Sequence, residues 1–200
     1  MGARISIGVV SLLFFTLMIT GSSVAGEPTE NVRHTTDKIL SIITDDELKA
    51  PEKAAERKKL VRDAVDERFN WPDMSRRTLG RHWSRRSDKE KKEFIDLYGK
   101  LLERTYLSKV GDYSGEKVIY LREVIDGNYS LVCINIIDKT GAEIPVKYKL
   151  KKKGDDWLVY DISIEGVSLV NNYRSQFNSI IMRSSFEKLI EQLKIKVAEE

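Results

Sequence analysis

The sequence predicts an α+β fold in which N-terminal helices precede a four-stranded, curved antiparallel sheet and C-terminal helices follow it. Apolar residues recur every three or four positions between residues 37 and 110, as in amphipathic helices. The period changes to two after Gly111 and Gly115, and it returns to the helical value after Gly166. Helices and strands are therefore segregated along the chain, which favours α+β over alternating α/β topology.

The chain opens with the features of an export signal. Arg4 supplies a positive charge, residues 5–19 form an apolar run, and an SVA tripeptide ends at residue 25. A retained membrane anchor is the alternative, but the run is shorter than the ~20 apolar residues that a spanning helix needs. We therefore expect residues 1–25 to be a cleaved signal peptide and residues 26–200 to form a single domain.

Charge and cysteine content argue against two classes of protein. Lysine and arginine number 34 against 31 acidic residues, and loss of Arg4 with the signal lowers the net charge from +3 to +2. This balance argues against a protein that mainly binds nucleic acid. The single cysteine, Cys133, cannot form an intramolecular disulfide, and its apolar neighbours predict a small buried side chain.

The first predicted helices carry recognisable start signals. Thr44-x-x-Glu47 has the form of a capping box, and Pro51 can occupy the first turn of a longer amphipathic helix that extends to about Phe69. A short helix is expected over 72–79, with Gly80 as its left-handed terminal residue.

A second capping box opens the most strongly amphipathic helix. Ser87-x-x-Glu90 marks its start, and the helix is expected to end near Ser108. Its broad apolar stripe comprises Phe94, Leu97, Tyr98, Leu101, Leu102 and Tyr106. This helix is therefore expected to pack against a core.

Four strands are expected over 117–124, 129–138, 143–152 and 157–164, joined by short glycine-containing turns. Links this short indicate an antiparallel meander. The third strand alternates, with Lys147, Lys149 and Lys151 on a face that meets water. The second strand is apolar on both faces, so both are expected to be covered.

Two segments carry a resemblance that periodicity alone does not supply. The first is FNWPDMSRRTLGRHW at 69–83, followed by LLERTY at 101–106. The second is WLVYDISIEGVSL at 157–169, continued by YRSQF at 173–177. Together they resemble the toluene-tolerance, or MlaC-like, family of periplasmic substrate-binding proteins across nearly the whole mature chain.

The resemblance implies a periplasmic carrier whose sheet and helices enclose an apolar lipid cavity. In that family the ligand is a phospholipid, held by its acyl chains, and transport maintains outer-membrane lipid asymmetry. The implied partners are an inner-membrane ABC transporter with an MCE-domain protein and an outer-membrane lipoprotein and porin complex. A hopanoid-type lipid remains an alternative cargo, and an adaptor that binds no lipid remains an alternative function.

Candidate cavity residues are apolar side chains on the strand face opposite the lysines and on the facing helices. They are Leu97, Leu101, Val146, Tyr148, Leu150, Val159, Val167 and Val170. An ordinary packed core would have the same apolar pattern, and only the resemblance favours a cavity.

A cluster of basic residues surrounds Trp83. Arg76, Arg77 and Arg81 are its candidates for contact with an anionic head group or a protein partner. A solvated helix end with its charges paired locally is the alternative.

Catalytic and metal-binding motifs are missing from the sequence. Asp161 and Glu165 lie near Tyr160, and such a group can perform acid–base chemistry, but a salt bridge or a helix cap is the expected use. His34 and His82 have no partner at metal-binding or triad spacing, and the chain carries no phosphate loop and no Gly-x-Ser-x-Gly motif. We therefore predict that the protein is not an enzyme and needs no cofactor or metal.

Overall fold

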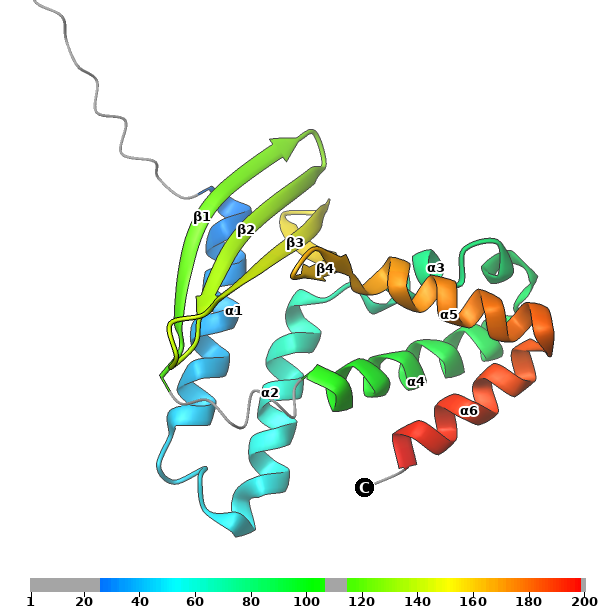
Figure 1. Ribbon diagram of the computed structural model, residues 1–200, viewed down its shortest axis with the longest axis horizontal. Helices are drawn as coiled ribbons and strands as arrows, with labels where there is room; N and C mark the ends of the chain where they lie inside the picture. The colour runs from blue at the N-terminus through cyan, green and yellow to red at the C-terminus, as the bar shows by residue number, and fades with distance from the viewer. Residues whose placement is uncertain (1–25, 107–114, 199–200) are drawn as a thin grey trace, which may run out of the picture.

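The structure is a computed structural model that describes residues 26–106 and 115–198. Its helices are α1 (Glu27–Thr44), α2 (Ala54–Arg68), α3 (Trp71–Leu79), α4 (Asp88–Tyr106), α5 (Leu169–Arg183) and α6 (Phe186–Ala198), with short 3-10 helices at Pro51–Lys53 and Gly80–Arg85. Its strands are β1 (Lys117–Asp126), β2 (Tyr129–Ile137), β3 (Glu143–Lys153), β4 (Asp156–Ile164) and β5 (Val167–Ser168). The order confirms the predicted α+β fold (Figure 1). The predicted signal peptide lies outside the described residues.

The sheet is an antiparallel meander in the order β1-β2-β3-β4-β5. The four predicted strands are present, and the two-residue strand β5 is the addition. β5 follows a turn in which Glu165 and Gly166 both have positive φ, 49° and 83°. A strand of two residues has no measurable hydrophobic period, which is why the pattern did not predict it.

Helix α1 differs from the prediction at both of its ends. It begins at Glu27 instead of near residue 37, with Pro28 in its first turn. Thr44 is its last residue and not a cap, because the Thr44 hydroxyl donates to the Leu40 carbonyl at 2.7 Å. The carboxylate of Asp45 instead accepts from the backbone N–H of Glu47 at 2.8 Å. The predicted capping box at Thr44 was therefore wrong, because the motif lies where one helix ends.

The caps predicted at the end of α3 and at the start of α4 are confirmed. Gly80 has the expected positive φ, 52°, at the end of α3. At the start of α4 the Glu90 carboxylate accepts from the backbone N–H and the hydroxyl of Ser87, both at 2.7 Å, and Glu90 N–H donates back to Ser87 Oγ at 3.3 Å. These reciprocal bonds satisfy helix-terminal donors and fix where α4 begins.

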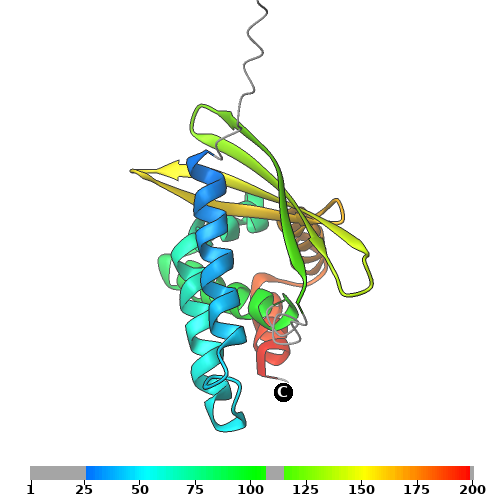
Figure 2. The same ribbon diagram turned by 90° about the vertical axis from the view of Figure 1, so that its left-hand side faces the viewer.

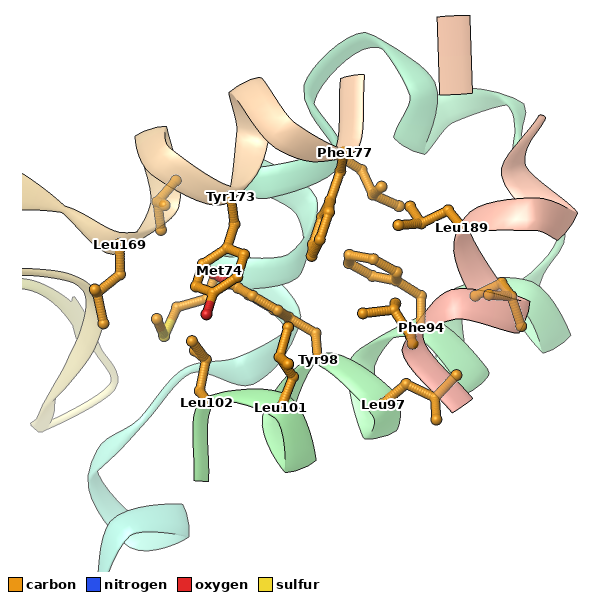
Figure 3. Close-up of a cluster of buried hydrophobic side chains, with 14 of the residues drawn as sticks. Met74, Phe94, Leu97, Tyr98, Leu101, Leu102, Leu169, Tyr173, Phe177 and Leu189 are labelled. Carbon is orange, nitrogen blue, oxygen red and sulfur yellow. The ribbon is translucent and has the colours of Figure 1, made fainter. Parts of the chain in front are cut away.

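One hydrophobic core lies among α3, α4, α5 and α6, beyond the β4 edge of the sheet (Figure 1). Phe94 and Tyr98 of α4 are both fully buried at its centre. Figure 3 shows the Phe177 ring lying edge-on to Phe94, with a centroid distance of 5.8 Å and an interplanar angle of 86°. Aromatic pairs in this geometry contribute about 0.5–1.5 kcal/mol beyond their buried area.

A second core lies between the sheet and helix α1. Its buried members are Val32, Val132, Ile134, Val146, Leu150, Trp157 and Val159. Helices α1 and α2 form an antiparallel hairpin on this side of the sheet (Figure 2). Hydrogen bonds to the Glu123 carboxylate from the backbone and hydroxyl of Thr29, at 2.7 and 2.6 Å, tie the start of α1 to β1.

The other face of β2 departs from the prediction. Leu131, Cys133 and Ile137 lie on that face and are only half-buried. Ile119 and Val124 of the neighbouring edge strand β1 are 46% and 42% exposed. Over the residues that the structure describes, this face is only partly covered, so the predicted covering of both faces was wrong.

Asp161 acts as a helix cap and an ion-pair partner. It is 3% exposed, and its carboxylate accepts from the Ser168 hydroxyl at 2.8 Å and from the Val170 N–H at 3.2 Å. The Lys149 ammonium lies 3.0 Å away on the adjacent strand. This confirms both structural uses expected for Asp161 and joins β3 and β4 to the first turn of α5.

Replacing Phe94 with alanine should destabilise the protein by about 3–5 kcal/mol, because it opens a cavity in the helical core. Ile195→Ala is the matched control, since Ile195 is 51% exposed and a surface change of this kind costs about 0.5 kcal/mol or less. Urea denaturation of both variants measures the difference. Equal losses would contradict the placement of Phe94 at the centre of the core.

Asp161→Ala should cost about 1–3 kcal/mol, because it removes a helix cap and leaves the buried Val170 N–H without its acceptor. Thermal unfolding measures the loss as a lower midpoint of the transition. An unchanged midpoint would contradict the structural role of Asp161.

Candidate functional site

An apolar cavity of about 190 Å³ lies where the two cores meet. The helical hairpin, the sheet and the C-terminal end of α4 form its wall. The lining residues are Val32, Thr35, Thr36, Ile39, Arg62, Val65, Arg68, Phe69, Trp71, Leu102, Glu103, Tyr106, Tyr148, Ile162, Ile164 and Leu169. Most of these side chains are aliphatic or aromatic, which suits a hydrocarbon ligand.

The position of the cavity follows from how the cores are joined. Phe69 and Ile162 are half-buried and pack against both cores. Phe69 reaches this position because its backbone bridges to Val159 of β4 and the Asn70 N–H donates to the Val159 carbonyl at 2.8 Å. The α2–α3 connection is thereby pinned to the sheet, and the space beside it is left for a ligand.

The polar side chains of α1 in the wall are satisfied within the helix. The Thr35 hydroxyl donates to the Asn31 carbonyl at 3.1 Å, and the Thr36 hydroxyl donates to the Val32 carbonyl at 2.9 Å. An apolar ligand can therefore lie against these residues without leaving a hydroxyl unpaired.

Arg68 is the most deeply buried charge in the wall. It is 8% exposed, and its guanidinium donates to Asp156 at 2.7 Å, to the Trp157 carbonyl at 2.8 Å and to the Thr35 hydroxyl at 3.2 Å. These partners belong to α1 and to the start of β4. Arg68 thus joins both helices of the hairpin to the sheet behind the cavity.

A second arginine network stands at the cavity rim between α2 and α4. The guanidinium of Arg62 donates to Glu103, and its Nε lies 3.0 Å from Asp66. The indole N–H of Trp71 donates to Asp66 at 2.6 Å. Burial disfavours the charge on Arg62, but Asp66 and Glu103 outweigh that effect and raise its pKa.

Two tyrosines complete the wall as neutral groups. Burial, with a smaller contribution from Tyr120, raises the pKa of Tyr148 to about 12. Burial and the nearby Tyr173 raise the pKa of Tyr106. Both phenols therefore stay protonated at physiological pH and add no charge to the wall.

The eight residues predicted to line a cavity are distributed over several places. Tyr148 is in the cavity wall. Leu97, Leu101 and Val170 are buried in the helical core, and Val146, Leu150 and Val159 are buried in the sheet core. Val167 is 55% exposed on β5. Contact of these residues with a ligand stays a prediction.

The hairpin contributes cavity residues that the sequence reasoning missed. Val32, Thr35 and Thr36 precede the predicted start of the first helix, and neither Arg62 nor Arg68 was among the residues predicted to contact a ligand. A proline at residue 28, in a position suited to the first helical turn, was the available signal for the true start of α1. The sequence carried no comparable signal for the arginines.

The three arginines proposed for head-group or partner contact lie away from this cavity. Arg76 and Arg77 both pair with Asp73, at 2.5 and 3.0 Å, and Arg81 donates to the side-chain oxygen of Asn178 at 3.1 Å. Burial opposes ionisation of Asp73, but its two arginine partners prevail and lower its pKa. A separate surface hollow contains Arg76 together with Trp83 and residues 151–153 of β3.

Residues 26–106 and 115–198 contain neither a metal-binding cluster nor a membrane-spanning helix. No group of three or more histidine, cysteine, aspartate and glutamate side chains could hold a metal ion there. None of the helices in those ranges is both long and apolar enough to cross a membrane.

Known proteins share this fold and sequence pattern. The structure matches that of a phospholipid-binding protein from Ralstonia solanacearum in complex with a phospholipid, with a TM-score of 0.76, 24% identity, and coverage of 86% of this chain and 98% of the other. The sequence is 23% identical over 191 residues to the intermembrane phospholipid transport system binding protein MlaC of Haemophilus influenzae, covering 92% of this chain and 89% of that protein. A family model described as MlaC protein matches residues 33–195, so the chain belongs to the MlaC family.

Proposed function

We propose that this protein is a periplasmic phospholipid carrier that holds acyl chains in the cavity between its two cores. The observation that carries the proposal is the apolar cavity between the two cores, in a chain of the MlaC family. The Haemophilus relative is named for intermembrane phospholipid transport, and the Ralstonia structure contains a bound phospholipid.

The energetics of lipid transfer explain why such a cavity is needed. Moving a two-chain lipid through water exposes tens of methylene groups at about 0.8 kcal/mol each, a barrier of order 20 kcal/mol. Apolar side chains such as Val65, Ile162 and Leu169 replace the contacts that the chains leave behind in the membrane. Binding alone therefore supplies the function, without covalent chemistry.

Loading must widen the cavity. Its volume of about 190 Å³ is smaller than the ~300–1,000 Å³ typical of sites for drug-sized ligands. Two acyl chains need more room than this. In our proposal the α1–α2 hairpin moves relative to the end of α4, because these elements meet at the cavity rim.

The proposed cycle carries phospholipid between two membrane complexes. Its partners would be an inner-membrane ABC transporter with an MCE-domain protein and an outer-membrane lipoprotein and porin complex, and the outcome would be maintained outer-membrane asymmetry. Arg76, Arg77 and Arg81 form an exposed or half-exposed basic region outside the cavity, which suits docking better than contact with acyl chains.

Native mass spectrometry of protein purified without detergent, followed by organic extraction, tests the proposal. We expect a stoichiometric two-chain phospholipid. A hopanoid or other polycyclic lipid would keep the carrier mechanism and change the cargo. A ligand-free mass in every preparation, with no uptake from vesicles, would contradict the proposal and favour an adaptor.

Ile162→Trp should lower lipid occupancy severalfold, because the indole ring is larger than the isoleucine side chain and fills the cavity from β4. Ile119→Trp adds the same ring at a position on β1 that is 46% exposed and should leave occupancy unchanged. Native mass spectra report occupancy, and circular dichroism confirms that both variants fold. Equal occupancy in the two folded variants would contradict this placement of the acyl chains.

A further inference from the structure

The cavity wall contains three charged residues, and they differ in their exposure and in what their present hydrogen bonds hold together. Arg68 lies behind the cavity, whereas Arg62 and Glu103 face each other across its rim. This ion pair joins α2 to α4, and a charged group at the rim is also within reach of a polar part of the ligand. The question is therefore whether either arginine can bind a polar part of the ligand.

Arg68 is poorly placed to bind a ligand anion. Its Nη1 serves both Asp156 and the Trp157 carbonyl, and its Nε serves Thr35. These bonds hold the hairpin to the sheet, so an anion that competed for them would have to displace structural contacts.

Arg62 has donors to spare. A guanidinium carries five N–H groups. Its Nε–H is directed to Asp66 and one Nη1–H to Glu103. The remaining three N–H groups, one on Nη1 and two on Nη2, have no acceptor among the residues that the structure describes.

The Arg62 side chain is also held in place before any ligand arrives. Asp66, which anchors Nε, is itself fixed by the indole N–H of Trp71 at 2.6 Å. The guanidinium carbon lies 5.9 Å from the Trp71 ring centroid, within range of a cation–π contact. A planar fork fixed in this way suits two oxygens of one phosphate or carboxylate group.

The position of Arg62 at the cavity rim suits a ligand that has an apolar part and a charged head. The Arg62 side chain is 22% exposed and Glu103 is 13% exposed, whereas Val65, one turn further along α2, is 5% exposed. Acyl chains directed inward past Val65 would leave a charged head beside Arg62. Lys58, 3.7 Å from Glu103 and 74% exposed, adds a second cation on the solvent side.

We propose that Arg62 is the head-group anchor of the carrier: its guanidinium binds the anionic oxygens of the ligand, a phosphodiester or a carboxylate, and Glu103 competes with them. This inference rests on the proposed function and adds the polar contact to it. A ligand anion would bind the N–H groups of Arg62 that have no acceptor among the described residues and would weaken its pairing with Glu103, while Asp66 keeps the guanidinium oriented.

Because Glu103 competes with the ligand for Arg62, substitutions of the two residues should change the affinity for an anionic lipid in opposite directions. Arg62→Gln should weaken binding of an anionic lipid about tenfold or more, because a charge-assisted hydrogen bond is lost. Glu103→Gln should strengthen the same binding, because the competing carboxylate is gone. A merely structural salt bridge would instead make both variants weaker binders or leave both unchanged.

The experiment is calorimetric titration of lipid-stripped protein with three water-soluble probes. They are a short-chain phosphatidylglycerol, the diacylglycerol with the same chains, and a fatty acid. Wild type should prefer phosphatidylglycerol to diacylglycerol, and Arg62→Gln should remove that preference while diacylglycerol binding persists. The fatty acid shows whether a carboxylate replaces the phosphodiester.

Two further variants serve as controls. Lys59→Gln removes the same charge from an exposed position on α2, where Lys59 pairs with Asp63 at 2.6 Å, and should change nothing. Arg62→Lys keeps the charge without the fork and should restore part of the preference.

The anchoring role of Arg62 would be contradicted if wild type bound phosphatidylglycerol and diacylglycerol with equal affinity, or if Arg62→Gln kept the preference. Either result would leave the proposed carrier function standing. Failure of wild type to bind either lipid would overturn the carrier itself and the anchor with it.

Discussion

The buried guanidinium of Arg68 is the contact on which the cavity depends. It lies at the end of α2 and bonds to Thr35 of α1 and to the first two residues of β4, so it joins three elements. Asp156 is 56% exposed, so this ion pair is worth less than a fully buried one. The Trp157 carbonyl and the Thr35 hydroxyl complete the set, and loss of Arg68 would leave them without a donor.

The cavity exists because each core is completed without it. The helical core closes around Phe94 and Tyr98, and the sheet core closes around Val132 and Leu150. Between the two cores, polar contacts fix the α1–α2 hairpin to the sheet at separate points. The apolar side chains of the hairpin that lie between those points face open space. Well-packed interiors seldom contain such space, and the apolar contacts missing there are those that a hydrocarbon ligand would supply.

Charge is distributed to suit this arrangement. The wall facing the hydrocarbon space has neutral phenols and satisfied hydroxyls, while Arg62 and Glu103 stand where the space meets solvent. Asp161 is the acidic residue that most suggests catalysis in the sequence, but its carboxylate caps α5 and pairs with Lys149.

The sequence alone determined the α+β order, the four main strands and the caps at Gly80 and Ser87, because these features arise from local periodicity and local hydrogen bonds. It also carried the motifs of the family. Only the tertiary structure decided which apolar residues line the cavity, since Tyr148 faces open space while Val146 and Leu150 on the same strand face are packed. The roles of Arg62 and Arg68 were decided there too, because their partners lie 41 and 88 residues away along the chain. Periodicity shows which face of an element is apolar, but whether that face meets another side chain or an empty space depends on how distant elements pack.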